Sequence, residues 1–212
     1  MSKDLSDFRK SYLKGVLNEI DLPEDPIKLF SEWFGYIDSK KTELEPNAMS
    51  LSTVDNDNIP ITRIVLLKKF SNAGFVFFTN YNSRKSKAIK NNPNVSLSFF
   101  WPNTEQQVII SGIASKLDDI DSENYFNTRP LGSQLGAIVS NQSEIIESRE
   151  FLENKMSELK LSHTSIKRPK NWGGYNVNPF SIEFWQGRDN RLHDRILYRK
   201  VNNSWNHVRL SP

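Results

Sequence analysis

Short clusters of basic residues are the feature of this sequence most suited to chemistry. Arg84 and Lys85 follow Ser83, a residue type that favours the N-cap of a helix, so both cations are expected in its first turn. Cations there oppose the helix dipole, whereas free backbone amides and two fixed cations together would bind a phosphate. The segment therefore predicts a phosphate site, with a solvated pair of cations as the alternative.

A strand-like segment upstream has a cation at each end. Residues 63–68 read Arg-Ile-Val-Leu-Leu-Lys, and strand alternation places Arg63 and Lys68 on opposite faces. These charges suit a small phosphorylated ligand, or they mark two strand ends that reach solvent.

Another concentration of Arg and His lies near the C-terminal end. After an expected hairpin turn at residues 187–190, Arg191, His193 and Arg195 would share one face of the return strand, about 6–7 Å apart at successive positions. Cations this close repel one another unless an anion or an acid lies opposite. Trp185 would supply a flat apolar wall, and the alternative is the polar outer face of an edge strand.

A fourth set of polar residues recurs every four positions. Tyr125, Arg129 and Ser133 could offer phenol, guanidinium and hydroxyl donors to one anion. Pro130 is expected to break the helix between them. Gln142–Ser143 is interpreted most simply as the cap of the helix that follows.

Composition restricts the class of protein. The 212 residues are 37% hydrophobic and 25% charged, with 13 Phe, 5 Trp and 6 Tyr, which excludes a disordered chain. The absence of Cys excludes disulfides, thiolate metal sites and cysteine nucleophiles, and three scattered His residues argue against a metal site. With a net charge of +3 and basic runs of two residues at most, nucleic-acid binding is not expected.

The sequence also bears on location. No apolar run approaches the ~20 residues of a membrane span, and the first residues lack the apolar stretch of a signal peptide. We therefore expect a cytoplasmic protein without a membrane partner.

The elements that must position these residues are mostly strands. Asp25 and Pro26 are a helix-start signal, and apolar residues at helical spacing follow to about residue 41. Residues 1–22 are expected to form a short amphipathic helix or a mobile arm or lid, residues 23–212 a single domain, and residues 161–169 a surface loop. Period-two patterning and turn residues predict strands at 48–54, 59–70, 75–79, 95–101, 106–117, 180–187, 192–199 and 205–210, and further helices at 83–92, 121–128, 131–140 and 143–160. This is an α+β protein, mainly antiparallel β, with a sheet or barrel and added helices.

Taken together, these motifs resemble the pyridoxamine 5′-phosphate oxidase family. The residues that carry the resemblance are Arg-Ile-Val-Leu-Leu-Lys at 63–68, Ser-Arg-Lys at 83–85, Phe-Trp-Gln-Gly at 184–187 and Arg-Leu-His-Asp-Arg at 191–195. The motifs run in order from about residue 9 to 212. The resemblance implies an FMN-binding split β-barrel with surrounding helices and a homodimer whose two active sites lie at the interface.

The implied activity is oxidation of pyridoxamine 5′-phosphate and pyridoxine 5′-phosphate to pyridoxal 5′-phosphate, with O₂ as acceptor and H₂O₂ as product. The family pattern places the FMN phosphate against Arg63, Arg84, Lys85 and Ser143. The rest of the flavin site would consist of Ile64, Val65, Leu66, Leu67, Lys68, Phe78, Thr79, Gln107, Gln142, Trp185 and Arg195.

The resemblance also assigns residues to the substrate. Its phosphate would be held by Lys68, Tyr125, Arg129 and Ser133, while Arg191 and His193 would face the pyridine ring as the catalytic pair. Arg9 and Tyr12 match a family arm that folds over the site.

Several positions depart from the family pattern, among them Ile138–Val139 in place of Trp-Ala and Ser211 in place of Ala. Phe78 stands where Tyr is common, Gln106 replaces an Arg, and Glu45 replaces an Asp. Within the same fold, an oxidase of phenazine biosynthesis is the alternative; outside enzymes, a non-catalytic binder of FMN or pyridoxal phosphate is another, and a nucleic-acid-binding module is a third.

Overall fold

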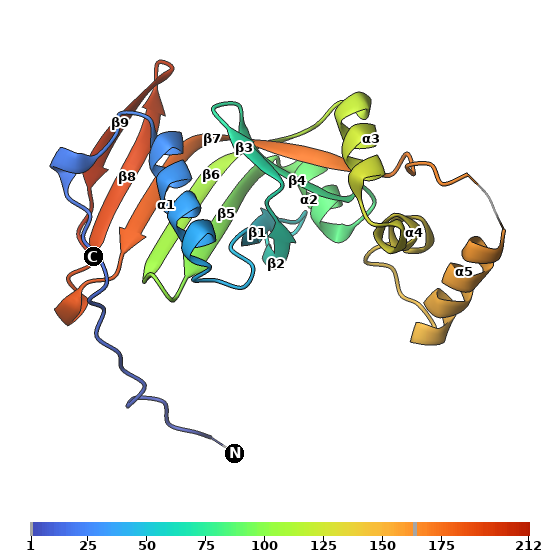
Figure 1. Cartoon of the computed structure of the whole chain (residues 1–212), viewed down its shortest axis with the longest axis horizontal. Helices are drawn as coiled ribbons and strands as arrows, with labels where there is room; N and C mark the ends of the chain where they lie inside the picture. Colours follow the sequence, from blue (N-terminus) through green and yellow to red (C-terminus); the bar gives the residue numbers. More distant parts are fainter. Residues whose placement is uncertain (1, 163–164) are drawn as a thin grey trace. The chain divides into compact units, whose positions relative to one another are not determined.

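The computed structural model of the chain describes residues 2–162 and 165–212. The expected loop at 161–169 includes His163 and Thr164, which lie outside these ranges. The strands are β1 (Ala48–Val54), β2 (Pro60–Leu66), β3 (Lys69–Ser71), β4 (Gly74–Asn80), β5 (Asn94–Trp101), β6 (Gln106–Lys116), β7 (Trp172–Gln186), β8 (Asp194–Val201) and β9 (Ser204–Arg209) (Figure 1). The helices are α1 (Pro26–Lys40), α2 (Arg84–Asn91), α3 (Asp119–Thr128), α4 (Leu131–Val139) and α5 (Arg149–Leu161), with short 3-10 helices η1 (Glu19–Asp21) and η2 (Asp189–Arg191).

The strands form one sheet in the order β2-β1-β5-β6-β7-β4-β3, and β8 pairs with both β7 and β9. The β3–β4, β4–β7, β7–β8 and β8–β9 pairs are antiparallel. The chain divides into two compact units. The first unit comprises residues 2–49, 97–111 and 179–212, and the second unit comprises residues 50–96 and 112–178.

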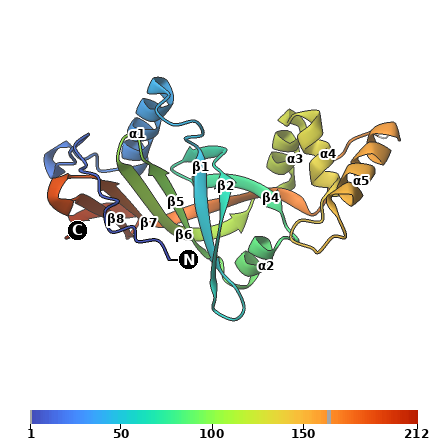
Figure 2. The ribbon, with the colours of Figure 1, turned by 90° about the horizontal axis from the view of Figure 1, so that it is seen from below.

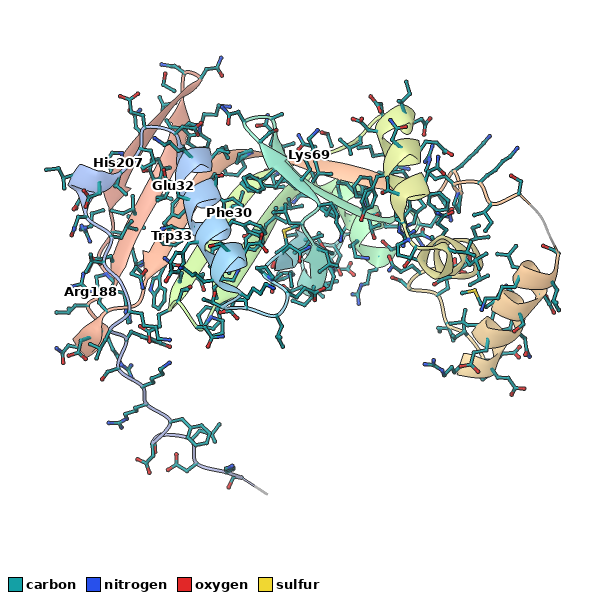
Figure 3. The ribbon with its side chains drawn as sticks, in the orientation of Figure 1. Phe30, Glu32, Trp33, Lys69, Arg188 and His207 are labelled. Carbon is teal, nitrogen blue, oxygen red and sulfur yellow. The ribbon has the colours of Figure 1, made fainter. Side chains whose placement is uncertain are left out.

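Helix α1 builds the core of the first unit. The Asp25 carboxylate accepts the Ile27 N–H at 2.9 Å, which satisfies one of the free amides at the helix start. The apolar side of α1 then buries Phe30, whose ring lies 5.3 Å from that of Phe99, and Trp33 meets Phe184 edge-on at 5.2 Å (Figure 3). These aromatic contacts fix the strand segments that end near Trp185.

Strand β4 builds the core of the second unit. Its residues are buried on both faces, with Phe75 and Phe77 fully covered, and it pairs with the first half of β7. Figure 2 shows α3, α4 and α5 grouped beyond the end of β4. Residues of β4, α3 and α4 line the site described below.

Several element predictions are corrected by the structure. The long strand expected at 59–70 is divided, because β2 ends at Leu66 and β3 begins at Lys69. Strand β7 begins at Trp172 instead of residue 180. Residues 2–18 form no helix, so of the two alternatives for this segment the amphipathic helix is wrong. The division into an arm and a single domain stays a prediction.

None of the helices in the described ranges is both long and apolar enough to cross a membrane.

Candidate functional site

A polar cavity of about 960 Å³ lies within the second unit. Its walls come from β2, β4, the first turn of α2, the α3–α4 junction and residues 140–143. The predicted site residues that line it are Arg63, Ile64, Val65, Leu66, Lys68, Phe78, Thr79, Arg84, Lys85, Tyr125, Arg129, Ser133, Gln142 and Ser143. Residues from four separate motifs therefore converge on one cavity.

The ammonium group of Lys85 is buried in the wall of this cavity. Its Nζ donates to Gln142 Oε1 at 2.8 Å and to Thr79 Oγ1 at 3.2 Å, and both of these acceptors are neutral. Burial, with the nearby charge of Arg63, lowers the pKa of Lys85 from its ordinary 10.5 to about 8. A buried cation is costly unless it is paired, so an anion entering here would relieve that cost.

Two arginines stand beside Lys85. Arg63 donates from Nη1 to Leu51 O at 3.0 Å and to Thr53 Oγ1 at 2.8 Å, and burial and then the charge of Arg84 lower its pKa. Arg84 forms an ion pair with Asp55 at 3.3 Å, but its guanidinium is largely exposed, which weakens the pair. The three cations together give the cavity a strongly positive end.

Ser143 takes a role different from the predicted one. The helix expected from residue 143 begins at Arg149, with Ser148 as its cap. Ser143 instead has a positive φ of 78° and its Oγ accepts the Arg84 N–H, the first amide of α2, at 3.2 Å. Its hydroxyl therefore lies at the positive end of the cavity. The interpretation of Ser143 as the cap of the following helix is wrong.

A second group of donors comes from the α3–α4 junction. Helix α3 ends at Thr128 and α4 begins at Leu131, so the break at Pro130 is confirmed. The guanidinium of Arg129 lies 4.5 Å from the ring centroid of Trp172, and burial lowers its pKa. Its Nη1 is buried and has no hydrogen-bond partner among the residues that the structure describes, and an anionic oxygen would supply one.

Aromatic rings support this second group. The ring of Phe78 stacks on that of Tyr125 at 3.8 Å and on that of Trp172 at 5.5 Å. Arg168 fixes the strand end behind them, because its Nη1 donates to Trp172 O at 2.6 Å while its Nε donates to Glu123 at 3.0 Å. The sequence analysis assigned no site role to Trp172, although Trp-Gly-Gly at 172–174 is one of the motifs that resemble the family.

All but one of the remaining predicted residues belong to the first unit. The exception is Leu67 of the second unit, which is buried and does not line the cavity. Arg9 is exposed and its Nε donates to Ser6 O at 2.9 Å. The first unit holds Arg9, Tyr12, Gln107, Trp185, Arg191, His193 and Arg195.

Three of these residues form an aromatic cluster. The rings of Trp185 and His193 are 4.7 Å apart, and Tyr12 lies edge-on to both, at 5.7 Å and 5.8 Å. His193 Nδ1 accepts the Arg188 N–H at 3.1 Å, which orients the imidazole.

The expected strand face of Arg191, His193 and Arg195 is wrong. Strand β8 begins at Asp194, and η2 with a positive φ of 62° at Arg191 precedes it. Arg195 alone of the three lies on the strand, where it pairs in register with Trp185 and donates from Nε to Glu183 at 2.8 Å.

Comparison with known families identifies the chain. Residues 39–163 match the family described as pyridoxamine 5′-phosphate oxidase. The chain belongs to this family. Residues 172–212 match the family's pyridoxine 5′-phosphate oxidase C-terminal dimerisation region, which begins where β7 begins.

Relatives of this family match over almost the whole chain. The pyridoxine/pyridoxamine 5′-phosphate oxidase of Flavobacterium johnsoniae is 56% identical over 98% of this chain and 99% of its own. That of Christiangramia forsetii is 50% identical over the full length of both. The crystal structure of PhzG from Burkholderia lata, in complex with tetrahydrophenazine-1-carboxylic acid, is 29% identical, with a TM-score of 0.87 over 93% of this chain and 98% of that one. The predicted family, the oxidoreductase class and the split-barrel fold are confirmed.

Proposed function

We propose that this protein is an FMN-dependent oxidase that converts pyridoxamine 5′-phosphate and pyridoxine 5′-phosphate to pyridoxal 5′-phosphate, with O₂ as acceptor. The observation that carries the proposal is the pair of donor groups in one cavity, one around Lys85 and one around Arg129. In the first group, the buried ammonium of Lys85 donates only to neutral oxygens, so an anion would balance its charge. In the second group, Arg129 Nη1 has no hydrogen-bond partner among the described residues, so an anion would supply one. Cofactor and substrate both carry a phosphate, so the cavity has one donor group for each.

The residues present fit FMN. Arg63, Arg84 and Lys85 would hold its phosphate, and the Ser143 hydroxyl, whose oxygen accepts the Arg84 N–H, would add a neutral donor. The apolar side chains of β2, which line the same cavity, would pack against the ring system. When bound, the flavin supplies the two-electron redox chemistry that amino-acid side chains lack.

The second donor group would position the substrate. The ring of Trp172 holds the Arg129 guanidinium in position, and stacking on Phe78 holds the Tyr125 ring in position. Together with Lys68 and Ser133, these donors would hold the substrate phosphate and so restrict the motion of the reacting carbon. Donors that are already fixed lose less entropy when the ligand binds.

The complete site would lie at the interface of a homodimer. The predicted flavin and substrate residues Trp185, Arg191, His193 and Arg195 fall in the region that matches the dimerisation region, and they belong to the first unit. The cavity is formed by the second unit alone. We propose that the first unit of one subunit completes the cavity of the other.

Anaerobic titration of the purified protein with pyridoxine 5′-phosphate tests the activity. Loss of the visible flavin absorbance, with recovery in air, would support flavin, substrate and O₂ together. A yellow protein that does not bleach would favour another substrate or a binding role. A protein that stays colourless with added FMN would contradict the cofactor.

Mixed dimers test the interface. Arg129→Met weakens substrate binding in the cavity, and Arg191→Ala removes the side chain that would reach the cavity from the other subunit. The assay therefore uses pyridoxine 5′-phosphate well below KM, where each variant alone should have little activity. If each site uses both subunits, co-refolding the two variants brings the activity to about a quarter of the wild-type value, because half of the dimers then carry one intact site. No recovery, or a monomer mass by light scattering with flavin bound, would contradict the interface.

A further inference from the structure

A buried carboxylate holds the N-terminal arm of the first unit. Glu105, in the turn between β5 and β6, accepts the backbone N–H groups of Leu13 at 2.8 Å and Lys14 at 3.0 Å on the same Oε2. Its Oε1 lies 3.6 Å from Lys10 Nζ. The Glu105 side chain therefore contacts the arm at Lys10, Leu13 and Lys14. Two of these contacts are made by backbone N–H groups, so most substitutions of side chains in the arm would leave them intact.

The turn around Glu105 is built for this contact. The side chain of Glu105 is only 2% exposed, and its φ of 59° is uncommon for a residue with a side chain. Its carbonyl accepts Gly187 N–H at 2.8 Å, which ties the turn to the end of β7. A buried carboxylate is unfavourable without donors, and the arm supplies donors here.

Tyr12 sits directly before the held amides. A Cβ added at Gly187 would lie 2.8 Å from Tyr12 Cβ, so the tyrosine rests on the bare backbone of that glycine. Its ring then meets Trp185 and His193, the aromatic pair at the start and end of the β7–β8 connection. The position of Tyr12 is thus set by the backbone that Glu105 holds.

The arm on either side of Tyr12 is held differently. On the C-terminal side, Lys14 Nζ donates to Asn103 O at 2.7 Å and Leu17 N–H donates to Asp194 Oδ2 at 3.1 Å. On the N-terminal side, the side chains of Leu5 and Phe8 are exposed, and Phe8 N–H bonds Leu5 O within the arm. Glu105 therefore stands where the fixed part of the arm begins.

We propose that Glu105 is a positioning residue, whose carboxylate fixes the arm at Leu13 and Lys14 and thereby seats Tyr12 on Trp185 and His193. The consequence for catalysis rests on the proposed function, since it requires that Trp185 and His193 serve the active site. The effect of Glu105 on the position of the arm does not depend on the proposed function. The effect on the arm and the effect on catalysis are therefore measured in separate experiments.

The rate of limited trypsin digestion reports how firmly the arm is held, and it does not depend on enzyme activity. Arg9, Lys10 and Lys14 are cleavage sites, and mass spectrometry distinguishes their products from those of other sites. Glu105→Ala should speed cleavage after Lys10 and Lys14 by about tenfold, the factor that corresponds to 1.4 kcal/mol. The matched control is Glu43→Ala, because Glu43 Oε1 accepts Asn103 N–H at 2.8 Å in the same turn without touching the arm.

Steady-state kinetics of the FMN-loaded enzyme measure the effect of Glu105 on KM and kcat. Glu105→Ala should raise KM for pyridoxine 5′-phosphate about tenfold and leave kcat within about twofold, because a positioning residue acts on the seating of the substrate. In a full-length Tyr12→Ala chain, which lacks the ring that the arm seats on Trp185 and His193, the same substitution should change neither value. Glu105→Gln keeps a carbonyl oxygen for both amides, so it should restore most of the wild-type KM.

Two results would overturn the proposal. One is a cleavage rate after Lys10 and Lys14 that Glu105→Ala leaves unchanged. The other is a KM effect of equal size in the Tyr12→Ala background, which would show that Glu105 does not act through the seating of Tyr12. If Glu105→Ala does not fold, Glu105→Gln carries the digestion test, with faster cleavage after Lys10 expected because the ion pair is lost.

Discussion

Lys85 should make the affinity for FMN depend on pH. With a pKa of about 8, its ammonium is about 90% charged at pH 7 and about 10% charged at pH 9 in the unliganded protein. The phosphate of FMN does not titrate in this range, because its second pKa is about 6. If the phosphate needs the charged lysine, the Kd for FMN rises about tenfold from pH 7 to pH 9.

The assay is titration of the unliganded protein with FMN at several pH values, followed by flavin fluorescence. Riboflavin is the matched ligand control, because it lacks the phosphate and should show no rise of Kd from this source. Lys85→Arg is the matched protein control, since a guanidinium stays charged throughout the range and should flatten the curve. A Kd for FMN that is constant from pH 7 to 9, or an equal rise in Lys85→Arg, would refute the reasoning.

The stability of the unliganded protein should increase with pH, whereas its affinity for FMN should decrease. The folded pKa of Lys85 is lowered to about 8, whereas the unfolded chain titrates near 10.5, so the unfolded state binds more protons between these values. The free energy of unfolding therefore rises as the pH rises from about 8 to 10.5. Urea denaturation of wild type and Lys85→Met across this window measures the difference, and parallel curves would contradict the burial of the charge.

Three further changes have defined outcomes. Arg129→Met should raise KM for pyridoxine 5′-phosphate roughly 10- to 100-fold, the size of a lost hydrogen bond to a charged group, with FMN affinity within about twofold; an unchanged KM would contradict its role. Arg168→Gln should lower the free energy of unfolding in urea by about 1–3 kcal/mol, because the buried carbonyl of Trp172 loses its donor; no change would show that water replaces it. Burial would raise the pKa of Asp194, but the hydrogen bonds that it accepts from Arg188, a backbone amide and Arg209 lower it below its ordinary 3.8. Asp194→Asn should therefore destabilise the protein at pH 7 and progressively less as the pH falls below about 4, and an equal loss of stability at every pH would contradict this ion pairing.

Elements with local signals follow from the sequence. Helix α1 begins at Pro26 after the Asp25 cap, as predicted, because both residues act within one turn. The start of β7 does not follow in this way. Gly173 and Gly174 have weak strand propensity, and they pair with Thr79 and Phe78 of β4, nearly a hundred residues away. A Cβ at Gly174 would lie 2.9 Å from Phe78, so close packing explains a glycine that patterning treats as a loop.

The segment after β7 shows the same limit at the site. Alternation predicted a strand through Arg191, but Asn190 and Arg191 have φ values of 54° and 62°, which end the extended backbone. The ring of His193 is instead oriented by Arg188 N–H, and this bond depends on that irregular turn. Periodicity could not predict it, because a period assumes the regular backbone that the turn interrupts.

The residue types alone were enough to predict sites for phosphorylated ligands. Arginines and lysines in short motifs predicted phosphate ligands, and the same motifs identified the family. Only the tertiary structure decided which of these cations have no anionic partner within residues 2–162 and 165–212. Lys85 is buried against Thr79 and Gln142, and Arg129 lies over Trp172 with Nη1 unsatisfied. Burial and desolvation depend on segments that are distant in sequence, so no spacing rule along the chain predicts them.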